Sequence, residues 1–380
     1  MQTMRIGMVA GEASGDLLSS LMLAGLRERW PDLQAHGIGG PRMAAQGFDA
    51  WWPSHKLSIF GYVDALMHLR ELLSIRKQLG DRLLAARPDV FIGVDAPDFN
   101  FGLEQRLRSA GIKTVHFVCP SIWAWRAERV ETIRRAADHV LCLFPFEPEI
   151  LHKHGIAATY VGHPLADAIP LEPPRRAARQ ALGLDEQDQV VALLPGSRRS
   201  EIKYIAEPML RAAVLMLKAK PDLRFVLPVA PGLRAMIETL KARVAPDLQV
   251  QLLDGRSHEA LAACDVTLVA SGTATLEAAL FKRPMVIAYR MHLLNWLRMR
   301  NKSYLPWVGL PNVLANEFLV PELIQDACTP RALAEQGLAW LNDKERYART
   351  QARFEEQHAL LRRNTAQLSV EVITKVVDAA

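Results

Sequence analysis

Short apolar runs alternate with amphipathic stretches along most of the chain, and this alternation predicts the secondary structure. In the first half, a segment of helical periodicity follows each run, and the runs are RIGMVAG, QAHGIGG, DVFIGVDAP, KTVHFVCP and HVLCLF. Runs without polar interruption are typical of strands buried on both faces, as in a parallel sheet with crossover helices. The pattern therefore predicts an α/β fold of the doubly wound type.

The alternation stops once and then restarts, which predicts two domains. A segment rich in proline and charge, IPLEPPRRAARQALGLDEQDQ, has the composition of a connection between domains. VVALLPGS, FVLPVA, VQLLDG, DVTLVAS and MVIAY then read as a second series of buried strands, and from Pro330 onward the chain is helical and charged. We expect Rossmann-like domains over residues 1–170 and 186–344, facing each other across a cleft at the carboxyl ends of their strands.

Composition narrows the class of protein. The chain has 380 residues, 50% of them apolar, and its 46 basic and 41 acidic residues give a formal net charge of +5. This size exceeds a single core, and the mild positive excess suits anionic ligands or lipid surfaces. No nucleic-acid-binding signature accompanies the charge, so we expect no nucleic acid partner.

Cysteine spacing and hydropathy indicate the compartment. The four cysteines stand far apart without metal-like spacing, which favours a reducing cytosolic compartment and argues against structural zinc. The first residues lack the pattern of a signal peptide, and no stretch has the length of a membrane span. Any membrane contact is therefore expected to be peripheral.

Two predicted strand-to-helix turns in the second half carry groups that suit a diphosphate. In ALLPGSRRSE, open amides at a helix start near Ser197 would combine with the guanidinium group of Arg198 to form an anion site. In DVTLVASGTATLEAAL, Ser271, Gly272 and Thr273 open the next such turn. The alternative for the first turn is ordinary helix capping with solvated arginines.

Glu277 is an acid among small and apolar residues, ASGTATLEAALFKRP, about one turn into the predicted helix. A buried carboxylate without a partner is costly, and helical side chains lean toward the N-terminus of their helix. We therefore predict that Glu277 binds the ribose hydroxyls of a nucleotide. The alternatives are compensation of the helix dipole or a capping box, but Ala274 stands where the box requires Ser or Thr.

The first turn of the chain, VAGEASGD, lacks the GxGxxG pattern of dinucleotide sites. Its two acids, Glu12 and Asp16, would repel a pyrophosphate, so we expect the turn to meet sugar hydroxyls or a catalytic proton. Ser14 lies between them. The alternative is helix capping by Ser14 with Asp16 favouring the dipole.

GVDAPDFN ends another predicted strand with polar groups at its carboxyl end, where Asp98 is a candidate general base and Asn100 a candidate acceptor contact. The alternative for Asp98 is a helix-capping acid. In PSIWAWRAERV, Trp125 and Arg126 combine an aromatic face with a guanidinium group, which suits a phosphorylated sugar, although core tryptophans with solvated arginines remain an alternative. The chain has no DxD, the spacing of metal-dependent sugar transferases, which favours a metal-independent reaction.

Two stretches have the composition of a membrane-contacting surface. In IFGYVDALMHLRELL, Tyr62, Leu66, Leu69 and Leu73 recur at helical spacing, although such a stripe is more often part of a core. In YRMHLLNWLRMRNKSY, basic residues alternate with apolar ones around Trp296, a composition compatible with an anionic lipid surface.

Seven motifs taken together resemble the lipid-A-disaccharide synthase family, the inverting glycosyltransferases of the lipopolysaccharide pathway. They are VAGEASGD, GVDAPDFN, PSIWAWR, VGHPLAD, LPGSR, SGTATLEAAL and LPNVLA, in this order between Val9 and Ala315. The resemblance implies a glycosyltransferase-B architecture in which the second domain holds a UDP-sugar. It also implies that the last helices, at about 345–380, cross back to complete a first domain that faces the acceptor and the membrane.

The resemblance further implies a reaction, a location and partners. 2,3-Diacylglucosamine would pass from UDP-2,3-diacylglucosamine to the 6-hydroxyl of 2,3-diacylglucosamine 1-phosphate, giving a β-1,6 disaccharide 1-phosphate and UDP without a metal or cofactor. The enzyme would be cytoplasmic and bound peripherally to the inner face of the inner membrane. The oligomeric state is left open, a homodimer included. The alternatives are a UDP-sugar 2-epimerase, which needs no acceptor, and a non-catalytic lipid- or nucleotide-binding protein.

The resemblance also assigns roles to matched residues. Asp98 matches the family's proposed catalytic base. Arg199 departs from the family pattern, in which smaller residues are commoner, so the choice between the two adjacent arginines for the phosphate contact stays open. The other matched positions are Arg198, Glu277 and Asn312 on the nucleotide side, and Glu12 and Ser14 near the reacting sugars.

Overall fold

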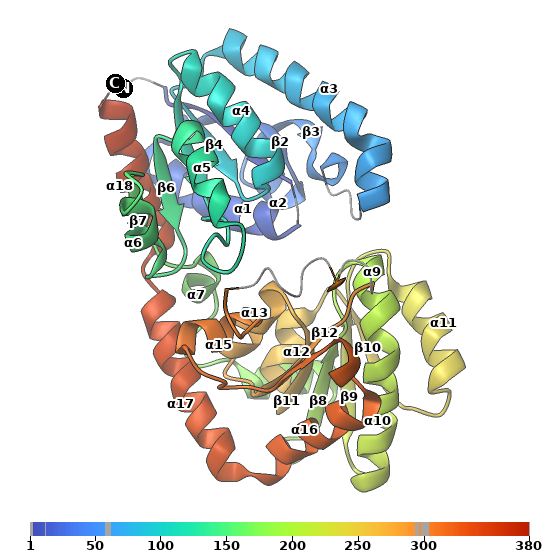
Figure 1. Ribbon diagram of the computed structural model, residues 1–380. Helices are drawn as coiled ribbons and strands as arrows, with labels where there is room; N and C mark the ends of the chain where they lie inside the picture. Colours follow the sequence, from blue (N-terminus) through green and yellow to red (C-terminus); the bar gives the residue numbers. More distant parts are fainter. Residues whose placement is uncertain (1–2, 12, 58–61, 293–295, 298–303, 380) are drawn as a thin grey trace. The chain divides into compact units, whose positions relative to one another are not determined.

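The computed structural model describes residues 3–11, 13–57, 62–292, 296–297 and 304–379, over which the chain divides into two compact units (Figure 1). Unit 1 comprises Met1–Asp167 and Leu361–Ala380, and unit 2 comprises Ala168–Leu360. Each unit contains one parallel sheet with helices on both faces, which confirms the predicted doubly wound α/β class.

The sheet of unit 1 has seven strands in the order β3-β2-β1-β4-β5-β6-β7, and every pairing is parallel. The central strand β4 is buried along its whole length, as expected of an uninterrupted apolar run in a parallel sheet. The strands are β1 (Arg5–Ala10), β2 (Gln34–Gly39), β3 (Asp49–Pro53), β4 (Val90–Val94), β5 (Lys113–Phe117), β6 (His139–Cys142) and β7 (Ala158–Tyr160).

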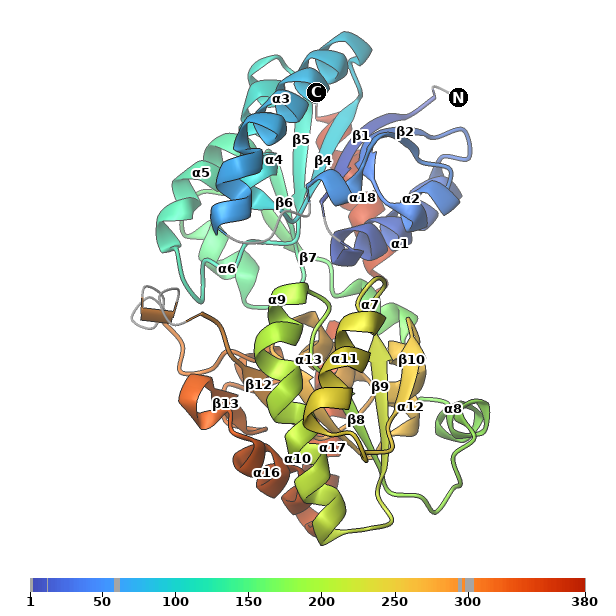
Figure 2. The same ribbon diagram turned by 90° about the vertical axis from the view of Figure 1, so that its right-hand side faces the viewer.

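Helices cover both faces of this sheet, with α3, α4 and α5 on one face and α1 and α18 on the other (Figure 2). Helix α18 packs tightly on α1, since an added Cβ at Gly25 would lie 2.7 Å from the Cβ of Ala366. The helices of unit 1 are α1 (Ala13–Arg29), α2 (Pro41–Ala45), α3 (Tyr62–Ala86), α4 (Pro97–Ser109), α5 (Val130–Ala136), α6 (Glu147–His152), α7 (Pro164–Ala168) and α18 (Thr365–Asp378), with short 3₁₀ helices at Ser54–Lys56 and Ala127–Arg129.

The sheet of unit 2 has six parallel strands in the order β10-β9-β8-β11-β12-β13. The strands are β8 (Val190–Leu194), β9 (Arg224–Val229), β10 (Gln251–Asp254), β11 (Val266–Ala270), β12 (Met285–Tyr289) and β13 (Glu322–Ile324). The helices are α8 (Arg175–Leu182), α9 (Arg199–Glu201), a π-helix at Ile202–Ala206, α10 (Glu207–Ala219), α11 (Arg234–Val244), α12 (Ser257–Ala263), α13 (Thr273–Leu280), α15 (Leu310–Ala315), a 3₁₀ helix at Gln325–Ala327, α16 (Pro330–Asn342) and α17 (Lys344–Leu361).

The segment interpreted from its composition as a connection is largely an integral part of unit 2. Helix α8 lies within it, and Arg179 of this helix is fully buried. Its guanidinium group donates to the carbonyl oxygen of Ala263, to three carbonyl oxygens of residues 185–188 and to Asp265 Oδ2. A second arginine of α8, Arg175, also pairs with Asp265 at 2.6 Å. These bonds fasten α8 to the start of β11, so the segment is not a free linker.

The C-terminal helices divide between the two units. Helix α17 belongs with unit 2, where Tyr347 donates to the carbonyl of Asp265 and Gln357 to that of Pro311. Asp167 accepts from the amides of Asn364 and Thr365 and so ties the start of α18 to unit 1. Of the helices expected at about 345–380 to complete the first domain, only α18 therefore lies in unit 1.

No helix among the described residues is both long enough and apolar enough to cross a membrane.

Candidate active site

The predicted site motifs occupy the strand-to-helix turns that follow β1 and β4 in unit 1 and β8 and β11 in unit 2. In each sheet these two strands are neighbours, and the strand order reverses between them. Open α/β sheets bind ligands outside the carboxyl ends of their strands at such a reversal. Each sheet therefore brings two of the motifs to its expected ligand-binding edge.

The turn after β4 is strained. Asp95 and Ala96 have φ angles of 49° and 42°, which non-glycine residues adopt at a cost. The side-chain amide of Asn100 holds this conformation, because its Nδ2 donates to the carbonyl oxygens of Val94 at 3.3 Å and Asp95 at 2.8 Å. Asn100 is 0% exposed. Asn100 therefore shapes the turn from within, and its contact with the acceptor stays a prediction.

Asp98 lies in the first turn of α4, and its side chain is 85% exposed. Its Oδ1 lies 2.5 Å from a guanidinium nitrogen of Arg129, whose own side chain is only 17% exposed. Arg76 donates to the carbonyl oxygen of Asp98 at 3.4 Å. The carboxylate is thus oriented by a well-anchored cation, and no hydrogen bond to a described residue engages its Oδ2.

A buried acid–histidine pair that joins α4 to the sheet was not identified in the sequence analysis. Glu104 Oε1 lies 2.7 Å from His116 Nδ1, and both side chains are fully buried. An added Cβ at Gly93 would lie 1.9 Å from that oxygen, so α4 meets β4 at a glycine. One feature of the sequence could have revealed this pair: Glu104 falls on the apolar face of the helical pattern, beside Phe101 and Leu107.

The turn after β1 separates two acids that sequence analysis grouped together. Asp16 is 3% exposed and accepts from the amides of Gly40, Arg42 and Met43, each at 3.0 Å. Its carboxylate therefore bonds the amides at the start of α2 and is not exposed at this turn. Ser14 is partly exposed in the first turn of α1, and Glu12 lies outside the described residues.

The two tryptophans of PSIWAWR have different surroundings. Trp123 donates through Nε1 to Glu147 Oε1 at 3.0 Å, and its ring meets those of Phe144 and Phe146 edge-on. Trp125 instead carries the guanidinium group of Arg126 over its ring, 4.3 Å from the centroid. The structure thus brings together the two residues predicted to bind the acceptor, both partly exposed.

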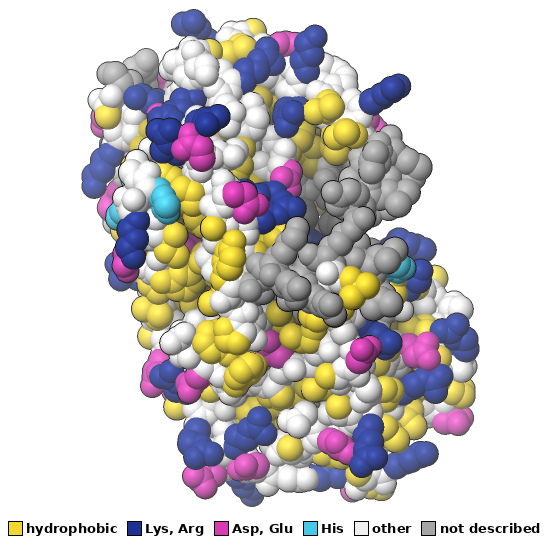
Figure 3. Space-filling model, viewed as in Figure 1, with side chains coloured by type: hydrophobic (Ala, Val, Ile, Leu, Met, Phe, Trp, Pro, Cys, Tyr) yellow, Lys and Arg dark blue, Asp and Glu magenta, His cyan; other side chains and the backbone are white. Residues whose placement is uncertain are grey.

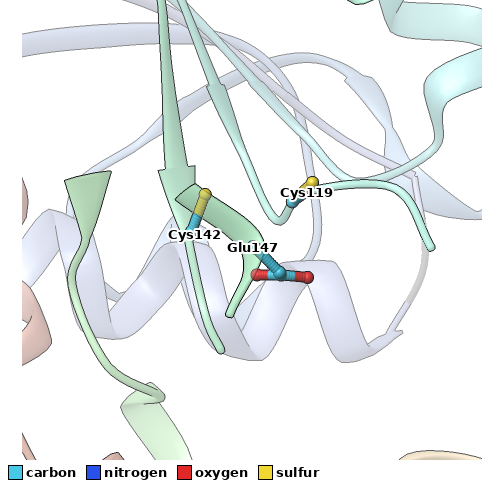
Figure 4. A group of neighbouring side chains, drawn as sticks. All are labelled: Cys119, Cys142 and Glu147. Carbon is cyan, nitrogen blue, oxygen red and sulfur yellow. The ribbon is translucent and has the colours of Figure 1, made fainter. Parts of the chain in front are cut away.

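Glu147 also belongs to the group of three potential metal ligands found among the described residues, with Cys119 and Cys142 (Figure 4). Their ligand atoms lie within 4.8 Å of one another, and all three residues are buried. Burial raises the pKa of Glu147 to about 8, and a hydrogen bond with Cys119 together with burial raises the pKa of the Cys142 thiol. Both oxygens of Glu147 are already bonded within the chain, Oε1 to Trp123 Nε1 and Oε2 to the amide of Phe144. The cluster suits packing better than metal binding.

The turn after β8 corrects the prediction of open amides at Ser197 and Arg198. Glu201 Oε2 accepts from the amide of Ser197 at 2.8 Å and from that of Arg198 at 3.2 Å. Its other oxygen meets the Arg198 guanidinium group at 3.4 Å. The Glu201 carboxylate therefore occupies this anion site. The Ser197 hydroxyl is exposed, and the Arg198 guanidinium group is partly exposed. A π-helix follows at once, a feature frequent at functional sites.

The turn after β11 differs, because no side chain of a described residue caps α13. Its N-cap, Gly272, has φ of 147°, and both Gly272 and Thr273 are exposed. Ser271 donates through Oγ to the carbonyl oxygen of Val308 at 3.4 Å. Of the two turns in unit 2, this one offers uncapped amides for an anion.

Glu277 has a partner within the chain. Its side chain is 18% exposed, and its Oε2 lies 3.3 Å from Nε2 of His258. The premise that this acid lacks a protein partner is therefore wrong. Its role toward a ribose stays a prediction.

Asn312 is fully buried, and its side chain is used internally. Nδ2 donates to the carbonyl oxygen of Val320 and to Glu322 Oε1, while Oδ1 accepts from the amide of Val320. Glu322 also accepts from the amides of Val308 and Gly309, and its burial raises its pKa. Asn312 thus holds the segment that contacts Ser271, and its contact with the nucleotide stays a prediction.

The chain matches known proteins over nearly its whole length. A family described as Lipid-A-disaccharide synthetase matches residues 6–377. A lipid-A-disaccharide synthase of Verminephrobacter eiseniae (strain EF01-2) is 57% identical over 379 residues, covering 98% of this chain and 97% of that one. One of Albidiferax ferrireducens is 58% identical over 382 residues, covering 99% and 98%.

Solved structures share the fold at low sequence identity. A UDP-GlcNAc 2-epimerase from Neisseria meningitidis bound to UDP-GlcNAc has a TM-score of 0.70 at 14% identity, covering 98% of this chain and 100% of that one. The glycotransferase of kitacinnamycin has a TM-score of 0.64 at 16% identity, covering 99% and 100%. These similarities support two Rossmann-like domains.

The buried acid Glu147 predicts a pH dependence of stability. Its folded pKa of about 8 exceeds its usual value of 4.5, so its contribution is complete below pH 4.5 and is lost as the pH rises to about 8. The loss amounts to a few kcal/mol at most, on the order of 1.4 kcal/mol for each pH unit between the two values. Glu147→Gln should remove this slope: the variant should be less stable than the wild type near pH 5, where it lacks one acceptor, and more stable near pH 8.5, where the wild type carries a buried charge.

The measurement is the midpoint of thermal unfolding between pH 5 and pH 8.5. Glu149→Gln is the matched control, because Glu149 lies on the same helix but is exposed and paired with Lys153. An unchanged slope in Glu147→Gln would show that Glu147 does not titrate in this range.

Proposed function

The chain belongs to the lipid-A-disaccharide synthase family and is a glycosyltransferase, and from this premise we propose its reaction. It transfers 2,3-diacylglucosamine from UDP-2,3-diacylglucosamine to the 6-hydroxyl of 2,3-diacylglucosamine 1-phosphate, releasing UDP. The observation that carries this proposal is the family match over residues 6–377. The epimerase alternative has only the fold in its favour, at 14% identity, whereas relatives above 50% identity are named synthases.

We propose that unit 2 holds the donor's nucleotide. The diphosphate meets the uncapped amides at Gly272 and Thr273, at the start of α13, and the guanidinium group of Arg198, with the Ser197 hydroxyl beside it. Glu277 accepts from the ribose hydroxyls. This arrangement is supported by the contrast between the two turns of unit 2, since Glu201 holds the amides of one and leaves those of the other available. One preorganised donor to a developing charge contributes about 3–4 kcal/mol.

Unit 1 supplies the acceptor side in this proposal. Trp125 offers a face to the sugar ring, and Arg126 a charge to its phosphate. Ser14 lies in the first turn of α1, after the strand β1 that neighbours β4, and the family pattern adds Glu12 to the acceptor side. Asp98 Oδ2 accepts the proton of the 6-hydroxyl as that oxygen attacks the anomeric carbon. The bond from this carbon to the diphosphate breaks, configuration inverts, and UDP departs with the bonding electrons.

We also propose that the enzyme works in the cytoplasm at the inner face of the inner membrane and takes its acylated substrates from the lipid surface. Helix α3 supports this, because Leu69 and Leu73 are 47% and 44% exposed beside the exposed Arg70 and Lys77. Figure 3 shows exposed hydrophobic side chains among basic ones where α3 lies. Apolar and basic groups together suit an anionic bilayer surface.

The reaction is tested by incubating the protein with UDP-2,3-diacylglucosamine, with and without the acceptor, and resolving the products by mass. UDP and the disaccharide 1-phosphate should form only when the acceptor is present. An epimerase would alter the sugar nucleotide without the acceptor, and that outcome would overturn the proposal.

Asp98→Asn should reduce turnover about 10²–10⁴-fold, the usual contribution of a general base. UDP affinity, measured by calorimetry, should stay unchanged because the proposed nucleotide contacts all lie in unit 2. Asp81→Asn is the control, since Asp81 is also an exposed aspartate paired with an arginine, Arg106. Full turnover in Asp98→Asn would remove it as the base.

The double variant Leu69→Glu, Leu73→Glu should sediment roughly tenfold less with phosphatidylglycerol vesicles, because each leucine forfeits part of the ~1.5–3 kcal/mol of full burial. Leu215→Glu, an exposed leucine on α10 of unit 2, should sediment like the wild type. Equal sedimentation of all three proteins would exclude α3 as the contact surface.

A further inference from the structure

The carboxylate proposed to bind the ribose is held by a histidine of the neighbouring helix. His258 is the second residue of α12, and its Nε2 lies 3.3 Å from Oε2 of Glu277 on α13. The imidazole ring also packs against Phe281, with ring centroids 5.2 Å apart and an interplanar angle of 59°. Phe281 follows Glu277 by one helical turn, so the imidazole ring of His258 lies along one face of α13 and contacts both residues.

This contact restricts a side chain that otherwise has several rotamers. The Glu277 side chain is 18% exposed, whereas that of His258 is 47% exposed. The contact with His258 is made through Oε2, and among the described residues no hydrogen bond involves Oε1. A carboxylate fixed through one oxygen presents the other in a defined direction, which lowers the conformational entropy lost when a ligand hydroxyl binds it.

We propose that His258 is a positioning residue for donor recognition: it orients Glu277 toward the ribose hydroxyls of the UDP moiety. The inference rests on the proposed role of Glu277. A merely structural contact between α12 and α13 would stabilise unit 2 without affecting which hydroxyls the protein recognises.

Calorimetric titration separates these roles. UDP and 2′,3′-dideoxy-UDP are titrated into the wild type, His258→Ala, Glu277→Ala and the double variant. His258→Ala should weaken UDP binding about three- to tenfold, the range typical of contacting residues. It should leave the dideoxy analogue unaffected, and it should have no further effect once Glu277 is alanine.

Two further variants sharpen the test. His258→Gln keeps a donor near the position of Nε2 and should recover most of the UDP affinity. Glu259→Ala removes another charged contact of α12, the pair with Arg256, and should leave UDP affinity unchanged.

The outcomes distinguish this inference about His258 from the proposed ribose contact of Glu277, on which it rests. If Glu277→Ala leaves UDP affinity unchanged, the ribose contact itself is wrong and His258 has nothing to position. If Glu277→Ala weakens UDP binding but His258→Ala does not, only the inference fails. It also fails if His258→Ala weakens the dideoxy analogue equally, or retains its effect in the Glu277→Ala background.

Discussion

At the carboxyl edge of a parallel sheet, the backbone amides of the following turn no longer bond to a neighbouring strand. The rest of this structure depends on which groups accept hydrogen bonds from these amides. Buried donors and acceptors without partners are costly, so each turn needs a polar group of its own. Asp16 accepts three such amides and Glu201 two, while Asn100 bonds the carbonyl groups of a strained turn. Glu322 accepts two further amides at the start of α15. These internal bonds fix the loops that carry the candidate active site.

The same constraint divides the polar residues of the motifs into two groups. Residues turned inward complete the turns, and they include Asn100 and Asn312, both fully buried. Residues turned outward stay available for chemistry, as Asp98 does with its side chain 85% exposed. A motif therefore contains both the reactive groups and the groups that hold them, and only burial and bonding tell them apart.

Backbone strain marks the same edge of unit 1. Positive φ angles occur at Asp95 and Ala96 after β4, at Val118 after β5 and at Arg126 in the following segment. Such conformations are costly for non-glycine residues, above all for a β-branched valine, and persist where the surroundings enforce them. At the turn after β4, Asn100 is such a group, because its amide bonds the carbonyl oxygens of Val94 and Asp95. This strain supports the carboxyl edge of the sheet as the functional surface of unit 1.

The sequence by itself determined the α/β class and the turns where the site motifs lie, because uninterrupted apolar runs specify buried parallel strands and turn residues follow them directly. Tertiary structure alone decided which way the polar side chains face. Asp16 bonds amides 24 to 27 residues away, Asn312 bonds groups 8 to 10 residues away, and His258 reaches Glu277 from another helix. Likewise α8 became part of unit 2 through Arg179 and Asp265, 86 residues apart. Periodicity reports which face of an element is apolar, whereas a polar partner distant along the chain leaves no local pattern to read.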